Sequence, residues 1–149
     1  MFAQITNLLK LRIGVIMMLT ALVAMVITPG REPSAFEMLV LCFAVLISAG
    51  AAGAFNQYYE VDIDRKVART CTRPFVTGYF KKSPLWLGII GLLLLAGVVP
   101  AALILNAPTA LYIFLGAFFY AIVYTVWLKR RSWTNIVIGG ASGLSLIHI

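Results

Sequence analysis

The chain has 149 residues; 62% of them are hydrophobic, only 11% are charged, and the mean hydropathy is +0.98. Values this far from those of soluble domains exclude an ordinary water-soluble fold and indicate a membrane protein. The net charge of +7 is explained by membrane topology and anionic lipid headgroups, so the lipid bilayer is the expected partner and no nucleic acid is needed.

Long runs without any Lys, Arg, Asp or Glu cover most of the chain, at residues 13–30, 38–59, 83–128 and 132–149. A helix needs about 20 apolar residues to cross the hydrocarbon core, so the third run suffices for two crossings. We predict helices near residues 12–29, 36–57, 84–105 and 109–128, with a fifth beginning near Thr134. The predicted fold class is an all-α, polytopic transmembrane helical bundle, with residues 1–149 forming one transmembrane domain.

The predicted loops carry their positive charge on one side of the membrane. If the first helix starts in the cytoplasm, that side holds eleven of the twelve cations, namely Lys10, Arg12, Arg65, Lys66, Arg69, Arg73, Lys81, Lys82, Lys129, Arg130 and Arg131. Arg31 remains on the other side, beside Glu32 and Glu37. The positive-inside rule then places the N-terminus and the loop 58–83 in the cytoplasm.

Three of the five acidic residues, Glu60, Asp62 and Asp64, lie close together after the second predicted helix. If this helix continues to Asp64, then Asn56, Glu60 and Asp64 occupy positions i, i+4 and i+8 on one face, while Asp62 points elsewhere. We call Asn56, Glu60 and Asp64 the acidic column. Stacked like charges repel, so the sequence predicts a compensating charge nearby.

Two interpretations of the acidic column follow from residue chemistry. The first is local ion pairing, with Asp64 bound to Arg65, Asp62 bound to Lys66, and Glu60 in solvent. The second is a Mg²⁺ site, because Mg²⁺ is typically held by one or two carboxylates together with waters and substrate phosphates. In that case the cations that follow the column would neutralise the remaining phosphate charge.

The same residues resemble a known family. Asn56-x-x-x-Glu60-x-Asp62-x-Asp64 followed by Arg69-Thr70-x-x-Arg73-Pro74 is similar to the first Asp-rich motif of the UbiA superfamily of intramembrane prenyltransferases. Two later stretches, Tyr124-Thr125-x-x-Leu128-Lys129-Arg130-Arg131 and the segment 135–143, resemble the branch of this superfamily that farnesylates haem. Lys10-Leu11-Arg12 is similar to that branch's Lys-x-Arg start of the first helix.

This resemblance implies a helical bundle around a cavity open to the membrane. It implies Mg²⁺-dependent transfer of farnesyl from farnesyl diphosphate to a vinyl group of haem B (protohaem IX), giving haem O for haem–copper terminal oxidases. Haem B would be a substrate and not a prosthetic group. The bacterial cytoplasmic (inner) membrane is the implied location, and haem A synthase or oxidase assembly proteins are the implied protein partners.

The resemblance also implies roles for individual residues. The catalytic and Mg²⁺-binding residues would be Asn56, Glu60 and Asp64. The diphosphate-binding residues would be Arg69, Arg73, Lys129 and Arg130. Contacts to substrate or haem propionates would come from Lys10, Arg12, Tyr124 and Asn135. The π faces of Tyr58, Tyr59 or Tyr124 would stabilise an allylic cation, with ordinary packing as the alternative role for these rings.

The resemblance has departures and leaves alternatives open. Glu60 stands where many superfamily members have Asp, and residues 144–149 do not resemble the family's continuation. The second Asp-rich motif of the family is expected beyond this point. We therefore expect residues 1–149 to be the N-terminal fragment of a larger prenyltransferase domain, with four full spans and a partial fifth, inactive alone, and with 144–149 as a candidate non-native tail.

Other functions remain open on the sequence alone. A prenyltransferase with a quinone or chlorophyll precursor as its acceptor shares the first motif. A membrane transporter fragment is the main alternative from another class, although a transporter more often places polar residues in the middle of its spans. A non-catalytic scaffold is favoured only if the acidic residues are solvated and bind no metal.

Overall fold

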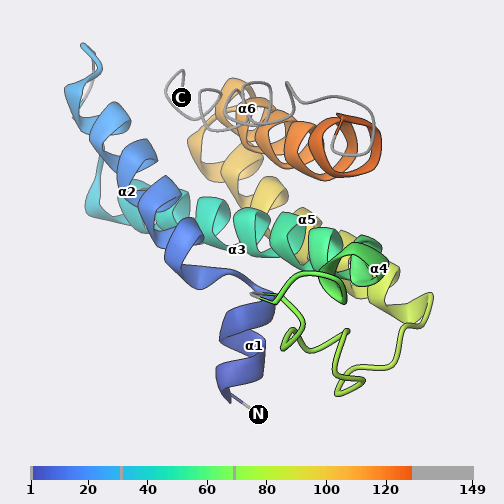
Figure 1. The fold of residues 1–149 in the computed structure, drawn as a ribbon. Helices are drawn as coiled ribbons and strands as arrows, with labels where there is room; N and C mark the ends of the chain where they lie inside the picture. The colour runs from blue at the N-terminus through green and yellow to red at the C-terminus, as the bar shows by residue number, and fades with distance from the viewer. Residues whose placement is uncertain (1, 31, 69, 129–149) are drawn as a thin grey trace.

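The computed structural model describes residues 2–30, 32–68 and 70–128, and throughout these residues the secondary structure is helical, without strands. In chain order the elements are α1 (Phe2–Leu8), α2 (Leu11–Ile27), α3 (Ala35–Tyr59), α4 (Val61–Asp64), α5 (Leu85–Pro100), η1 (Ala101–Leu105), α6 (Ala107–Phe118) and η2 (Phe119–Leu128) (Figure 1). The segments η1 and η2 are π-helical continuations of α5 and α6. The predicted all-α class is confirmed.

The predicted helix boundaries agree with the structure to within two residues for all four spans. Within the part of the chain that the structure describes, three helices are long and apolar enough to cross a membrane: Ala35–Tyr59, Leu85–Leu105 and Ala107–Trp127. The helix α2 has 17 residues, which is the lower end of the range for a crossing. The short helix α1 was not predicted, and the fifth helix expected near Thr134 lies outside the described residues.

The helix α3 lies across the middle of the molecule, with α2 crossing it on one side and α6 and η2 above it (Figure 1). Its start is fixed by a capping box, in which the Ser34 hydroxyl accepts from the Glu37 N–H and the Glu37 carboxylate accepts from the Ser34 N–H. Small residues between positions 48 and 54 are buried and let neighbouring helices approach closely.

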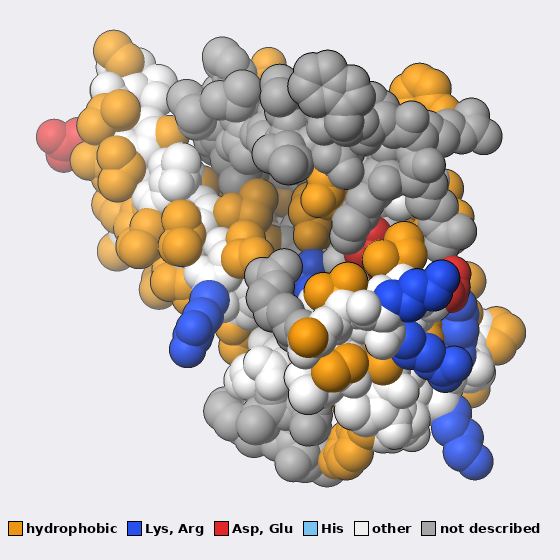
Figure 2. All heavy atoms as spheres, viewed as in Figure 1, with side chains coloured by type: hydrophobic (Ala, Val, Ile, Leu, Met, Phe, Trp, Pro, Cys, Tyr) orange, Lys and Arg blue, Asp and Glu red, His pale blue; other side chains and the backbone are white. Residues whose placement is uncertain are grey.

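The outer surfaces of the spans are apolar. Large aliphatic side chains are exposed along α2 and α5–η1, including Ile16 (65%), Leu92 (71%) and Leu103 (80%). Figure 2 shows hydrophobic atoms over α2, while Lys and Arg side chains gather where α4 and the following loop lie. Exposing such a surface to water would cost free energy, whereas lipid tails solvate it. The protein is therefore a multi-pass membrane protein with one strongly basic end.

The loop between α4 and α5 is folded back onto the helix ends by an aromatic cluster. Phe75 is 4% exposed and its ring contacts the rings of Tyr58, Phe80 and Trp86 at centroid distances of 5.7, 5.9 and 5.2 Å. Gly78 has φ +78°, a conformation that other residues adopt only with strain. The cluster gives this loop a defined path, and that path decides where Arg73 lies.

Replacing Gly97 with alanine is expected to destabilise the contact between α5 and α3. An added Cβ would lie 2.8 Å from the Ala44 carbonyl oxygen and would overlap the Ser48 hydroxyl, so α5 must move. Overpacking of this kind costs about 1–3 kcal/mol, which thermal unfolding in detergent would measure. Gly91→Ala is the control in the same helix, because its added methyl group meets nothing within 4 Å. Equal destabilisation by both variants would contradict the close contact at Gly97.

Candidate functional site

The acidic column is present, although the helix that carries it is interrupted. The prediction of a continuous helix to Asp64 is wrong at one residue, because α3 ends at Tyr59 and Glu60 has φ −96° and ψ 17°. The register survives the break, since the Glu60 N–H donates to the Asn56 carbonyl at 3.0 Å and the Asp64 N–H donates to the Glu60 carbonyl at 2.9 Å. Asp62 lies apart from the column and is exposed.

All three side chains of the column are buried, with exposures of 1% for Asn56, 0% for Glu60 and 3% for Asp64. This burial overturns the interpretation that Glu60 is in solvent. The predicted ion pair between Asp64 and Arg65 is wrong as well, because Asp64 Oδ2 binds Arg73 Nη1 at 2.6 Å. Buried carboxylates are costly without compensation, and Arg73 supplies one of the compensating charges from nine positions further along the chain.

The second cation that reaches the column is Lys10. Its Nζ donates to Asn56 Oδ1 at 2.5 Å, and its stem packs against Gly53, where an added Cβ would be 3.4 Å away. Lys10 has φ 48° and ψ 44°, in the left-handed region, between α1 and α2. This strained turn directs the residue toward α3, and strain of this kind is maintained only where the surroundings require it.

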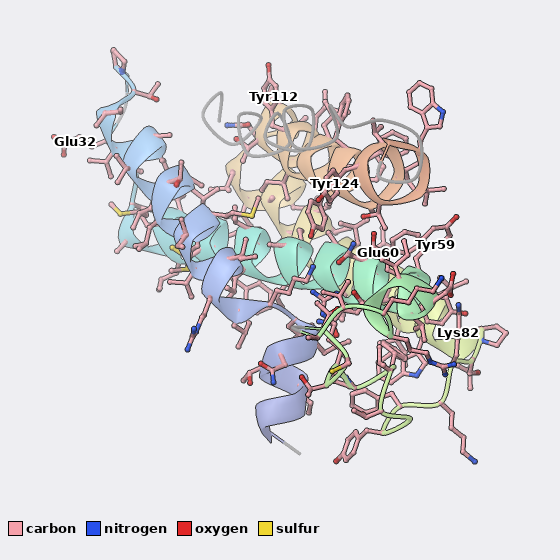
Figure 3. The ribbon with its side chains drawn as sticks, in the orientation of Figure 1. Glu32, Tyr59, Glu60, Lys82, Tyr112 and Tyr124 are labelled. Carbon is pink, nitrogen blue, oxygen red and sulfur yellow. The ribbon has the colours of Figure 1, made fainter. Side chains whose placement is uncertain are left out.

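The helix η2 closes the column from above. Lys10 Nζ also donates to Tyr120 Oη at 3.0 Å, and the Tyr120 ring stacks on Tyr124 at 5.4 Å. Asn56 Nδ2 donates to Glu60 Oε2 at 2.8 Å and to Thr125 Oγ1 at 3.2 Å. Figure 3 shows Glu60 and Tyr124 between α3 and η2, far from Glu32 at the other end of the molecule. The sequence pattern gave no role to Tyr120 or Thr125.

The other residues assigned from the sequence fall into two groups. Arg12 is exposed on α2 and is not brought into the network around Asn56. Tyr58 lies against Phe75 and under Lys82 (Nζ 5.1 Å from the ring centroid), and Tyr59 stacks on Phe55, so both rings have packing roles. The remaining predicted site residues lie outside the described residues: Arg69, Lys129, Arg130 and Asn135.

The donor set of the column fits magnesium in the form it takes with phosphates. Across residues 2–30, 32–68 and 70–128, no three His, Cys, Asp or Glu side chains gather as a metal cage. Two carboxylates and one amide oxygen are instead the partial set of hard oxygen ligands that Mg²⁺ uses when substrate phosphates and waters complete its shell. Lys10 contacts this set at Asn56 and Arg73 contacts it at Asp64, so both positive charges are placed to neutralise a bound anionic group.

The fold and the site together define an intramembrane helical protein with a buried acidic column at its basic end. Residues 17–149 match the profile of the UbiA prenyltransferase family, and the chain belongs to this family. No solved structure matches the chain.

Several curated proteins are similar over almost the whole chain. The chain is 53% identical over 140 residues to protoheme IX farnesyltransferase 2 of Paramagnetospirillum magneticum, covering 93% of the chain and 48% of that protein. It is 41% identical over 143 residues to protoheme IX farnesyltransferase 1 of the same organism, covering 95% and 50%. It is also 41% identical over 143 residues to protoheme IX farnesyltransferase of Rhodopseudomonas palustris, covering 95% and 44%. The chain spans about half the length of these relatives.

Replacing Arg73 with glutamine is expected to release the loop that follows α4. The Asp64 side chain is 5% exposed, and without Arg73 it keeps a buried charge that has lost its partner. The expected cost is about 1–3 kcal/mol, together with faster hydrogen exchange in residues 65–84. Arg65→Gln is the matched control, because Arg65 is exposed and surface substitutions usually change stability by less than about 0.5 kcal/mol. Unchanged exchange in Arg73→Gln would disprove the role of this ion pair.

Proposed function

We propose that the protein containing these residues transfers a farnesyl group from farnesyl diphosphate to a vinyl group of haem B, giving haem O for haem–copper terminal oxidases. The observation that carries this proposal is the buried column of Asn56, Glu60 and Asp64 between Lys10 and Arg73. The names of the relatives, all protoheme IX farnesyltransferases, support haem B as the acceptor.

In the proposed mechanism, Asn56, Glu60 and Asp64 hold Mg²⁺ together with the diphosphate. When bound, Mg²⁺ supplies positive charge that stabilises the departing diphosphate. Arg73 neutralises phosphate charge from the loop, and we propose the same role for Arg69, Lys129 and Arg130. The ammonium group of Lys10, already directed at the column, provides a further cation for the diphosphate or for a haem propionate. Contacts of Arg12 and Asn135 with substrate remain proposals from the resemblance.

The chemistry requires the allylic C–O bond to break, with the electron pair leaving on the diphosphate. Fixed cations around a site that excludes water stabilise this charge better than solvent does. The vinyl π electrons of haem then form the new C–C bond, which leaves a cation on the other vinyl carbon. Addition of one water molecule to that carbon and loss of a proton give the hydroxyl group of haem O. Tyr124, stacked on Tyr120 beside Lys10, is the aromatic residue that we propose for stabilising the allylic cation through its π face.

An apolar pocket between α2, α3 and α6 borders Lys10 and Tyr120, and its volume is about 50 Å³. This volume accommodates a few small atoms and not a farnesyl chain. We therefore assign no role in setting the prenyl chain length to this pocket.

We propose that residues 1–149 form the N-terminal part of a larger prenyltransferase domain, because the matched relatives are about twice as long.

Membership of the UbiA family disfavours a transporter fragment or a scaffold. A quinone or chlorophyll precursor remains the alternative acceptor at the level of the family alone, whereas the similarity to proteins named protoheme IX farnesyltransferase favours haem. Haem A synthase and oxidase assembly proteins are the proposed partners. The proposed location is the bacterial cytoplasmic membrane, with the N-terminus and the loop 58–83 in the cytoplasm, where charged substrate headgroups are available.

Substitution of either carboxylate in the column is expected to abolish product formation. The complete reading frame that contains residues 1–149 would be expressed in membranes and supplied with haem B, farnesyl diphosphate and Mg²⁺. Because each carboxylate is proposed to hold the metal, Glu60→Gln and Asp64→Asn should each lower haem O formation by about 100-fold or more. Chromatography with mass spectrometry would resolve the haem products.

The control for this experiment is Asp62→Asn, which removes an exposed carboxylate that lies apart from the column and should retain most of the activity. Prenylation of an aromatic acceptor while haem B stays unmodified would refute the haem assignment and keep the prenyltransferase class. Full activity in both Glu60→Gln and Asp64→Asn would refute the proposed metal site.

The proposed orientation predicts how the exposed Cys71 reacts in membranes. Cys71 lies in the loop assigned to the cytoplasm, while Cys42 is half-buried within α3. A membrane-impermeant maleimide should therefore label inverted vesicles and leave intact cells unlabelled. Cys71→Ser should remove the label, which assigns it to this residue. Labelling of intact cells at Cys71 would place the loop on the outer side and reverse the topology.

A further inference from the structure

The side chain of Thr125 connects η2 to the acidic column and has no role in the mechanism described so far. It is fully buried (0% exposed). Its hydroxyl donates to the Tyr120 carbonyl oxygen at 2.8 Å and accepts from Asn56 Nδ2 at 3.2 Å. Asn56 is 69 positions away in the sequence, so this contact joins two different spans at the site.

The directions of these hydrogen bonds follow from what each group can donate. A hydroxyl has one proton, and that of Thr125 is committed to the Tyr120 carbonyl, so Thr125 Oγ1 can only accept from Asn56. The other Asn56 N–H is committed to Glu60 Oε2 at 2.8 Å. Both amide protons are thereby used, and Oδ1 is left for cations, as its bond from Lys10 shows.

Two hydrogen bonds control an amide group more tightly than one. If Glu60 were the only acceptor, the Asn56 N–H would still be directed at the carboxylate, but the amide group could rotate about that hydrogen bond. The second bond, to Thr125, fixes the plane of the amide and with it the direction of Oδ1. The π-helical η2 supplies this bond, and π-helical turns inside longer helices frequently mark functional sites.

We propose that Thr125 is a positioning residue that fixes the amide plane of Asn56, so that Oδ1 is directed to the place where Mg²⁺ and diphosphate bind. This inference rests on the proposed function, because it assigns Asn56 to that metal site. Thr125 itself contacts neither metal nor substrate in this proposal. It acts through Asn56, in the way that groups hydrogen-bonded to metal ligands orient those ligands.

Valine is the informative substitution, because it replaces the hydroxyl of threonine with a methyl group of similar size and so removes both hydrogen bonds. The complete protein in detergent would be titrated with Mg²⁺ at a fixed concentration of inorganic diphosphate, and its thermal stabilisation would be followed. Thr125→Val should require about 10- to 100-fold more Mg²⁺ for half of the stabilisation, whereas Thr125→Ser should stay close to wild type. Thr20→Val is the control, because the Thr20 hydroxyl also donates to a helix carbonyl, that of Ile16, but outside the site.

A double-mutant cycle separates positioning from packing. Asn56→Ala should itself raise the Mg²⁺ requirement, and adding Thr125→Val to it should produce no further increase, because the group on which Thr125 acts is gone. An equal additional increase in the Asn56→Ala background would overturn the inference, and so would a wild-type Mg²⁺ requirement in Thr125→Val. If the valine variant does not fold, Thr125→Ala removes the same hydroxyl and is read in the same way.

The titration also distinguishes this inference from the proposed function, since it contains neither haem nor farnesyl diphosphate. If Mg²⁺ and diphosphate stabilise a wild-type protein that leaves haem B unmodified, the haem activity is refuted and the role of Thr125 stands. Absence of any Mg²⁺-dependent stabilisation in the wild type overturns the inference on Thr125.

Discussion

Two carboxylates buried at the end of a membrane-spanning helix are the constraint on which the rest of this structure depends. Glu60 and Asp64 are 0% and 3% exposed, and such charges are tolerated only when cations and hydrogen bonds replace the lost water. Arg73 and Lys10 reach the column from opposite directions in the sequence, one from the loop after α4 and one from the turn before α2. Each of these two contacts depends on a local backbone structure, the loop or the turn, that a helix bundle would not need merely to cross the membrane.

Those local structures explain features that otherwise look incidental. The left-handed conformation of Lys10 between α1 and α2 directs its side chain along Gly53 to Asn56. The aromatic cluster around Phe75 folds the loop onto the helix ends, and this brings Arg73 back to Asp64. An added Cβ at position 53 would already touch the Lys10 stem at 3.4 Å, so a side chain larger than that of alanine would have to displace this stem. Small residues on α3 therefore serve the site as well as the packing of the helices.

The sequence predicted the features that depend on length and spacing, and it failed where distant segments meet. Charge-free runs located the four spans, and the i, i+4, i+8 spacing located the column despite the break at Glu60. Helices that are apolar on all sides carry no signal for which face turns inward. The bonds from Lys10 and Thr125 to Asn56, over 46 and 69 positions, were therefore beyond prediction. Local pairing of Asp64 with Arg65 was wrong because the loop folds back and brings a more distant arginine closer.

The π-helical form of η2 is the last step that connects the fold to the site. A π-helical turn accommodates more residues than an α-helical turn, so every side chain beyond Phe119 is rotated relative to a continued α6. In the observed register, Tyr120 and Thr125 both reach the column. Among the residues that the structure describes, the two cations seen to reach the two carboxylates and the amide of the column are Lys10 and Arg73. One Mg²⁺ leaves a prenyl diphosphate with net negative charge, so the proposed reaction needs more cations than these two. The basic residues grouped at this end of the molecule are suited to supply them.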